Sequence, residues 1–190
     1  MTSIERKYKK LRPSIESGDI ICVRGNNVLP KLIEWADKAY YSHAFVAGGL
    51  GSRIVAIQSM ADGVQPYWLS KEIESNIDFC IIKILVPPNM KNRALNEAFR
   101  KGEKGIPYNF TELPKILLKE KLGINIKNMQ GNPSEDICSV FAGHTYAGKI
   151  CSCFENVYIK KGYLTPQNLV DIAKLNPSHL QIIGNNPYFI

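Results

Sequence analysis

The first half of the chain alternates short apolar runs with turn residues, which is the pattern of β-strands. The runs are rich in β-branched and aromatic residues, and glycine, proline or aspartate separates one run from the next. A glycine-rich stretch at residues 48–51 lies between two of them and is typical of a hairpin. The expected strands are residues 20–23, 43–47, 54–57, 64–68 and 79–86.

Apolar residues at helical spacing are the commoner pattern after residue 86. Thr165 followed by Pro166 predicts a helix start, because threonine caps the first turn and proline fits its first position. The expected helices are residues 28–40, 69–74, 89–101, 113–122 and 165–173, with a final strand at 180–183. Strands gathered at 20–86 and helices mostly after them predict an α+β fold.

Cys138 lies where one further helix is expected to begin. Ser134 and Asp136 are both plausible N-caps, and apolar residues at helical spacing follow. With either cap, Cys138 falls in the first turn, where unpaired backbone N–H groups and the helix dipole favour a thiolate and can hold an oxyanion. Cys138 is therefore our candidate nucleophile.

A thiol that carries out acyl transfer needs a base within hydrogen-bond reach, and the chain has three histidines. His43 opens an expected strand. His144 falls on a different face of the cysteine helix from Cys138, and His179 precedes the final strand. His43 is the best candidate base, although only tertiary packing brings it to Cys138.

The composition is that of a globular protein, with 190 residues of which 45% are hydrophobic and 22% are charged. We expect one domain over residues 1–190, with residues 1–16 as a basic N-terminal arm that supplies part of the net charge of +7. A solvated arm is favoured over an arm that binds an anionic polymer or a lipid surface. No nucleic-acid motif occurs, so we expect no nucleic-acid partner.

No apolar run approaches the roughly 20 residues of a membrane helix, and the first residues lack the apolar core of a secretory signal. We expect no transmembrane segment and a cytoplasmic or phage-associated location. The five cysteines, in a chain without an export signal, are expected to be reduced. Cys151 and Cys153 lack the spacing of zinc ligands, so we expect neither a metal nor a cofactor.

Seven short motifs follow one another along most of the chain. They are Gly18-Asp-Ile-Ile21, Tyr41-Ser-His-Ala-Phe-Val46, Ile54-Val-Ala-Ile-Gln58, Gly63-Val64, Pro107-Tyr-Asn109, Asp136-Ile-Cys-Ser139 and Leu164-Thr-Pro-Gln167. This series resembles the permuted NlpC-type, papain-like cysteine hydrolases of the YiiX/YebB-like group. In that group the histidine strand precedes the nucleophile helix, as it does here. The resemblance implies a papain-like α+β fold, with an antiparallel sheet packed against the nucleophile helix.

The resemblance also implies roles for single residues. Cys138 would be the nucleophile, His43 the general base and later the acid, and Gln58 the residue that orients the imidazole. Gln58 departs from the pattern, because some relatives carry a glutamate or another polar group there, and an amide does not stabilise an imidazolium as a carboxylate does. The residues expected to contact the substrate are Tyr108, Ser139 and Ser42.

The function expected first is a cysteine hydrolase that cleaves an amide bond of a cell-wall peptide through an acyl-enzyme, as in a phage-type enzyme. One alternative is a lipid acyl hydrolase or acyltransferase at a membrane surface, held there by the basic arm. The other is a catalytically silent structural or binding module of a larger assembly. A peptide or an acyl group would be the substrate in the first two cases.

Overall fold

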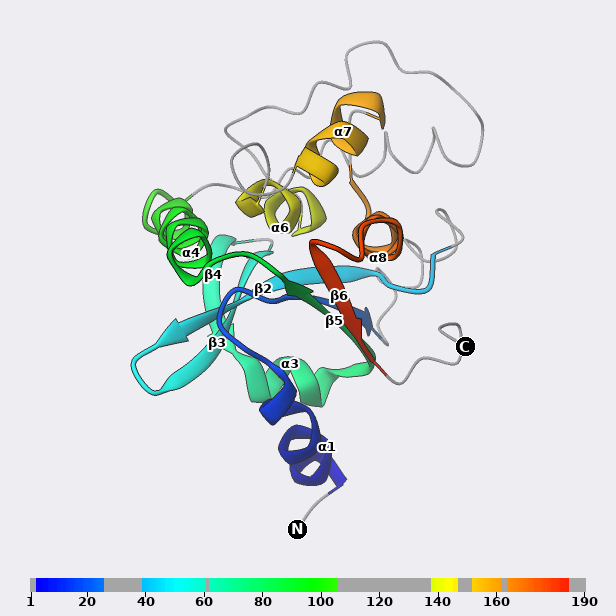
Figure 1. Ribbon diagram of the computed structural model, residues 1–190. Coiled ribbons are helices and arrows are strands. Elements are labelled where there is room, and N and C mark those ends of the chain that lie inside the picture. Colours follow the sequence, from blue (N-terminus) through cyan, green and yellow to red (C-terminus); the bar gives the residue numbers. More distant parts are fainter. Residues whose placement is uncertain are drawn as a thin grey trace.

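The computed structural model describes residues 3–25, 39–60, 62–105, 138–146, 152–161 and 164–184. These residues form one six-stranded sheet with helices on both faces (Figure 1). The expected α+β class is confirmed. None of the helices in the described part of the chain is long and apolar enough to cross a membrane.

All neighbouring strands of the sheet are antiparallel, in the order β4-β3-β2-β1-β5-β6. The strands are β1 (Ile20–Gly25), β2 (His43–Leu50), β3 (Arg53–Met60), β4 (Gly63–Trp68), β5 (Asn76–Ile84) and β6 (Leu180–Ile183). Every expected strand is confirmed. The fifth begins before the expected residue 79, because the chain passes directly from a short helix into the sheet at Asn76, and it ends at Ile84 and not at the expected residue 86.

Side chains alternate across the sheet and form a separate apolar cluster on each face. In β1, Ile20 and Cys22 belong to one cluster, whereas Ile21 and Val23 belong to the other. All four are completely buried. A strand that is buried on both faces reads as an uninterrupted apolar run, which is why residues 20–23 show no alternation in the sequence.

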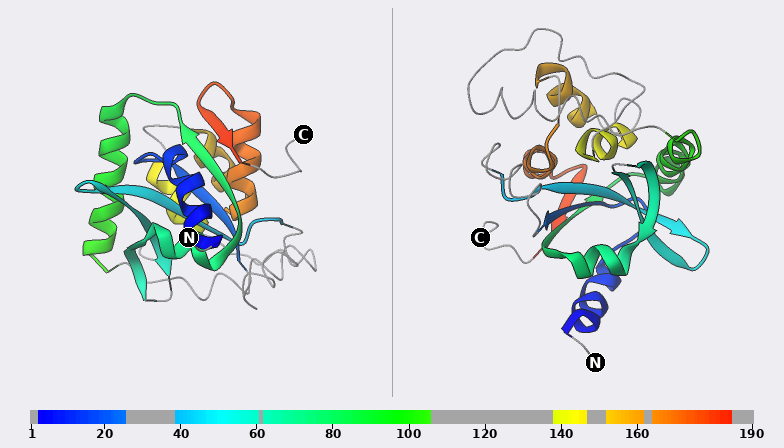
Figure 2. Two further views of the ribbon diagram at one scale, coloured as in Figure 1. Left: turned by 90° about the horizontal axis from the view of Figure 1, so that it is seen from below. Right: turned by 180° about the vertical axis from the view of Figure 1, so that it is seen from behind.

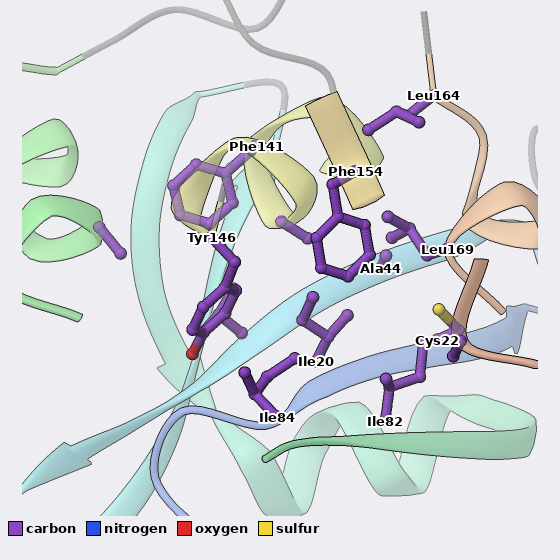
Figure 3. Close-up of a cluster of buried hydrophobic side chains, with 14 of the residues drawn as sticks. Ile20, Cys22, Ala44, Ile82, Ile84, Phe141, Tyr146, Phe154, Leu164 and Leu169 are labelled. Atoms are coloured by element: carbon purple, nitrogen blue, oxygen red, sulfur yellow. The ribbon is translucent and has the colours of Figure 1, made fainter. Parts of the chain in front are cut away.

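Each face of the sheet is covered by its own helices (Figures 1 and 2). On the first face lie α4 (Pro88–Glu103), α6 (Cys138–Tyr146), α7 (Ser152–Lys161) and α8 (Pro166–Leu175), and on the second lie α1 (Ser3–Leu11) and α3 (Leu69–Ser75). Figure 3 shows the first-face core, where side chains from α6, α7 and α8 meet those of β1, β2 and β5.

The basic N-terminal arm is a helix packed on the protein, not a solvated segment. Lys7 of α1 donates to the carbonyl oxygen of Asn76 at 2.6 Å and lies over the ring of Phe79 at 4.7 Å. Tyr8 and Leu11 pack against the apolar cluster of the second face. Among residues 6–11 of α1, the exposed side chains are those of Arg6, Lys9 and Lys10. A short 3-10 helix, η1 (Arg12–Ser14), then leads toward β1.

The helices agree with expectation in part. The structure confirms 69–74, 89–101 and 165–173, and in α8 Thr165 forms the expected cap in a reciprocal capping box with Asn168. Residues 152–161 form a helix, α7, that the sequence analysis does not predict. The expected helices at 28–40 and 113–122 lie outside the described residues, apart from Ala39 and Tyr40, which are not helical.

A buried carboxylate holds the turn before β1. Asp19 is completely buried, accepts the backbone N–H of Glu16 at 2.7 Å, and forms an ion pair with the Lys83 ammonium at 2.9 Å. Burial raises the pKa of Asp19 despite these favourable contacts. Its Oδ1 atom has no hydrogen-bond partner among the described residues, so the backbone N–H of Glu16 and the Lys83 ammonium together compensate for burying this charge.

Candidate active site

The helix that carries Cys138 is buried on almost every side. Eight of the nine residues of α6 are buried, and the exception is the partly exposed His144. The helix packs against β2 and β3 beneath it and against α4, α7 and α8 beside it. A helix enclosed in this way has no polar face, which explains why its sequence is apolar without a clear helical period.

Two hydrogen bonds fix α6 to the elements around it. The Ser139 hydroxyl donates to the carbonyl oxygen of Leu164 at 2.7 Å, just before α8. At the other end of the helix, the Tyr146 hydroxyl donates to the carbonyl oxygen of Gly18, next to β1. Cys138, the first residue of α6 in the structure, is therefore held by a rigid support.

The structure brings His43 and Cys138 together as hydrogen-bond partners. His43 is the first residue of β2, pairs with Val23 of β1, and is only partly exposed. Its Nε2 atom lies 2.9 Å from Oε1 of Gln58, so the Nδ1 side of the ring is left for the sulfur. The backbone N–H groups of Ala44 and Ser139 also donate to the sulfur of Cys138.

Burial and mutual attraction act in opposite directions on this pair. Burial alone lowers the pKa of His43, but the charge and hydrogen bond of Cys138, with help from Gln58 and Glu72, raise it from 6.5 to about 9. Burial likewise raises the pKa of the Cys138 thiol, but the His43 imidazolium and the two backbone N–H groups bring it below its ordinary value. The electrostatics of the site favour a thiolate–imidazolium pair.

Gln58 connects His43 to a buried carboxylate. It lies in β3 and is 1% exposed. Its Nε2 amide donates to Oε1 of Glu72 at 2.9 Å, and Glu72, in α3, is 7% exposed. Asn76 Nδ2 donates to the other carboxylate oxygen of Glu72 at 3.2 Å and to its backbone carbonyl at 2.8 Å. A continuous chain of hydrogen bonds thus runs from Cys138 to Asn76.

Sequence reasoning missed Glu72, although the sequence contains one signal for it. Leu69 is buried in α3, and Glu72, three residues later, falls on the same face of that helix. A carboxylate on the apolar face of a short helix needs partners inside the protein. Its partner, Gln58, was already a candidate on other grounds.

The hydroxyls expected to contact the substrate are engaged within the protein. Ser42 is buried, and its Oγ accepts the backbone N–H of Gly25 at 3.0 Å, while Ser139 binds Leu164 as described above. A substrate contact by either residue remains a prediction. Tyr108 lies outside the described residues. The other two histidines lie elsewhere: His144 is inside α6, and His179 accompanies Ser178 in an exposed turn before β6.

The described residues include no group of three or more His, Cys, Asp or Glu side chains that could hold a metal ion. Cys22, Cys80 and Cys138 are free, whereas Cys153 is disulfide-bonded, so the expectation that every cysteine is reduced is wrong for Cys153. Its sulfur is thus not available as a thiolate ligand. Cys151 lies outside the described residues.

Comparison with known proteins gives a match in fold. No protein-family model matches the chain, and no curated protein matches it. Among solved structures, the chain is similar to the crystal structure of the metalloprotein YiiX from Escherichia coli O157:H7, with a TM-score of 0.62 and 14% sequence identity. The match covers 90% of this chain and 97% of YiiX. A YiiX-like fold is therefore supported, whereas the papain-like permutation remains a prediction.

Proposed function

We propose that this protein is a cysteine hydrolase in which Cys138 is the nucleophile and His43 is the general acid and base. The observation that carries the proposal is the direct hydrogen bond between these two side chains, with a raised imidazole pKa and a lowered thiol pKa. A thiolate–imidazolium pair at a helix start is the activated form that acyl transfer by cysteine requires.

The proposed reaction has two steps. In the first, the Cys138 sulfur bonds to the substrate carbonyl carbon, and the imidazolium of His43 gives its proton to the departing amine as the carbon–nitrogen bond breaks. The product of this step is a thioester. In the second, His43 takes a proton from water while the water oxygen attacks the thioester, which releases a carboxylic acid and restores the pair.

The developing oxyanion needs donors that do not have to be reorganised during the reaction. The backbone N–H of Cys138, at the start of α6, is the donor that we assign to this role, because N–H groups in a first helical turn lack partners within the helix. The N–H groups of Ala44 and Ser139 serve the thiolate itself.

For the substrate we propose an amide bond of a cell-wall peptide, which is the choice that the sequence resemblance favours. The direct experiment uses an electrophilic acyl probe followed by peptide mass spectrometry. We expect one adduct, on Cys138, that is lost in Cys138→Ala and much reduced in His43→Ala. An adduct located on another residue would contradict the assignment of the nucleophile.

The lipid alternative gains no support from the position of the basic helix. Arg6, Lys9 and Lys10 are exposed on α1, which covers the opposite face of the sheet from α6 (Figure 1). A decisive measurement compares liposome binding and turnover of the wild type with those of the triple variant in which all three are replaced by glutamine. Equal liposome binding by the two proteins would contradict the hypothesis that the basic helix holds the protein at a lipid surface.

A silent binding module would have the same fold without an activated thiol. The rate of Cys138 alkylation as a function of pH separates the two cases. A thiol that titrates near the unperturbed value of about 8.5, and does so equally in His43→Ala, would rule out the catalytic proposal.

A further inference from the structure

Glu72 is a buried carboxylate that is linked to His43 by hydrogen bonds through the amide of Gln58. Burying a carboxylate is costly unless hydrogen bonds or charges compensate for it. Both of its oxygens accept from amide nitrogens, one from Gln58 and one from Asn76, and neither faces a hydrogen-bond acceptor in the described residues. Surroundings that supply only donors are suited to an ionised carboxylate, which can only accept.

The carboxylate fixes which way round the Gln58 amide lies. An ionised Glu72 can only accept, so the NH₂ group of Gln58 must face it and the carbonyl oxygen must face His43. Oε1 of Gln58 can in turn only accept, so Nε2 of His43 must carry a hydrogen. When the imidazole is neutral, its Nδ1 atom is therefore unprotonated and faces Cys138, as proton transfer from the thiol requires.

Asn76 keeps this arrangement in one orientation. Its Nδ2 donates to the backbone carbonyl of Glu72 as well as to the carboxylate, so a rotated Asn76 amide would lose both bonds. The orientation of the Asn76 amide therefore determines which group donates and which accepts at Glu72, at Gln58 and finally at His43.

We infer that Glu72 is a positioning residue of the candidate site, which acts through Gln58 to select the Nε2–H tautomer of His43 and supplies the negative charge that the amide lacks. The inference rests on the proposed function for its catalytic meaning. The charge of Glu72 also acts on the imidazole through space and favours its protonated form. The glutamine at position 58 thus does not leave the site without a carboxylate; the carboxylate lies one residue further from the imidazole.

The test exchanges the carboxylate of Glu72 and the amide of Gln58. In Glu72→Gln the charge is lost. The new amide has one carbonyl oxygen and one NH₂ group, so its NH₂ group must face the NH₂ group of either Asn76 or Gln58. In the double variant Gln58→Glu/Glu72→Gln, the new carboxylate accepts directly from His43, and the new amide donates to it and accepts from Asn76, so every bond has a donor and an acceptor. The matched control is Glu74→Gln, on the same helix, where Glu74 is exposed and paired with Lys71.

The readout is the rate of Cys138 alkylation by iodoacetamide between pH 5 and 10, on folded protein checked by circular dichroism. We expect Glu72→Gln to raise the thiol pKa by about one unit, which slows alkylation roughly tenfold at pH values below that pKa. The double variant should recover most of the loss, and Glu74→Gln should match the wild type. A Glu72→Gln protein with the wild-type pH profile would overturn the inference, as would a double variant no faster than Glu72→Gln.

A second measurement needs no change at Glu72 and covers the case in which that variant does not fold. Nitrogen-15 NMR of His43 in Cys138→Ala, above the pKa of the ring, reports the neutral tautomer. Nε2–H is expected, and Nδ1–H would overturn the inference. The proposed function is tested separately. An ordinary pKa for Cys138 in the wild type would contradict the hydrolase proposal but would not affect the tautomer result.

Discussion

His43, the first residue of β2, hydrogen-bonds Cys138, the first described residue of α6. The two side chains come from elements that pack face to face, and each moves the pKa of the other. The pair is therefore the part of the molecule where a small change in structure has the largest chemical effect.

His43→Ala should make Cys138 an ordinary buried thiol. Without the imidazolium, burial acts unopposed and raises the pKa, so alkylation at pH 7 is expected to fall by at least tenfold. Two internal controls lie in the same protein, because burial raises the pKa of Cys22 well above its ordinary value and that of Cys80 to about 12. Alkylation of these two thiols at the rate of Cys138 in the wild type would contradict the prediction.

Hydrolysis should show a bell-shaped dependence on pH. The ion pair exists only above the lowered pKa of Cys138 and below the raised pKa of His43, about 9, and the two apparent values belong to the pair. Because the pKa of His43 is raised by folding, its protonated form stabilises the native state fully below about pH 6.5, and this contribution is lost as pH rises through about 9. Turnover and thermal unfolding measured from pH 5 to 10 test both effects, and a His43→Ala protein that keeps the alkaline loss of stability would contradict this account.

Gln58→Met should be destabilising as well as inactivating. Methionine has a similar length but leaves the Glu72 carboxylate and the His43 N–H without their partner, which costs about 1–3 kcal/mol for each unsatisfied group. The control is Gln65→Met, since Gln65 is the cross-strand neighbour of Gln58 in β4 and is only partly buried. Urea unfolding measures the difference, and equal midpoints for the two variants would count against the prediction.

Lys83→Met should destabilise the fold by about 3–5 kcal/mol, because it leaves the buried charge of Asp19 without its ion-pair partner. Lys71→Met removes an ion pair with Glu74 that is largely exposed, and its effect should be within about 1 kcal/mol. Adding Asp19→Asn to Lys83→Met should restore part of the loss, since it removes the unpaired charge. A double variant no more stable than Lys83→Met would show that the charge is not the cause.

Gly143→Ala should destabilise despite the better helix propensity of alanine. A Cβ at this position would lie 2.5 Å from Cδ1 of Leu164 and 3.5 Å from Cδ2 of Leu169. Overpacking of this kind costs about 1–3 kcal/mol, against a gain of at most about 1 kcal/mol from propensity. If the contact with Leu164 is the cause, the cost should shrink in a Leu164→Ala background, which a double-mutant cycle measures.

The strands could be predicted because each one has a local signal, an apolar run bounded by turn residues. Residues 20–23 and 79–86 are apolar runs ended by turns or prolines. The expected hairpin between β2 and β3 is present, although residues 48–50 belong to β2 and the turn lies at residues 51–52. The helix α7 could not be predicted, because its apolar residues, such as Phe154 and Val157, are mixed with polar residues at no clear period. Gly143 lies within α6, where the lack of a side chain admits Leu164.

The sequence predicts three neighbouring residues of the candidate site but not the connection that continues from them, and the catalytic roles of these residues remain predictions. Cys138, His43 and Gln58 were identified from local motifs, and the structure places them in contact. Glu72 was not identified, because its role depends on which face of β3 carries Gln58, and only the sheet and α3 together decide that. Long-range contacts of this kind leave a trace in sequence only as a polar residue on an otherwise apolar face.

One end of α6 is held to β2, and the other end is held to the turn that precedes β1. The sulfur of Cys138 receives the N–H of Ala44, while the hydroxyl of Tyr146 reaches Gly18, beside the turn that precedes β1. The number of residues between these two contacts therefore determines where the sulfur of Cys138 lies. One residue inserted or deleted within α6 would turn Cys138 by about 100° and shift it by about 1.5 Å relative to His43, so the chemistry of this site depends on the length of a helix as much as on the identity of its first residue.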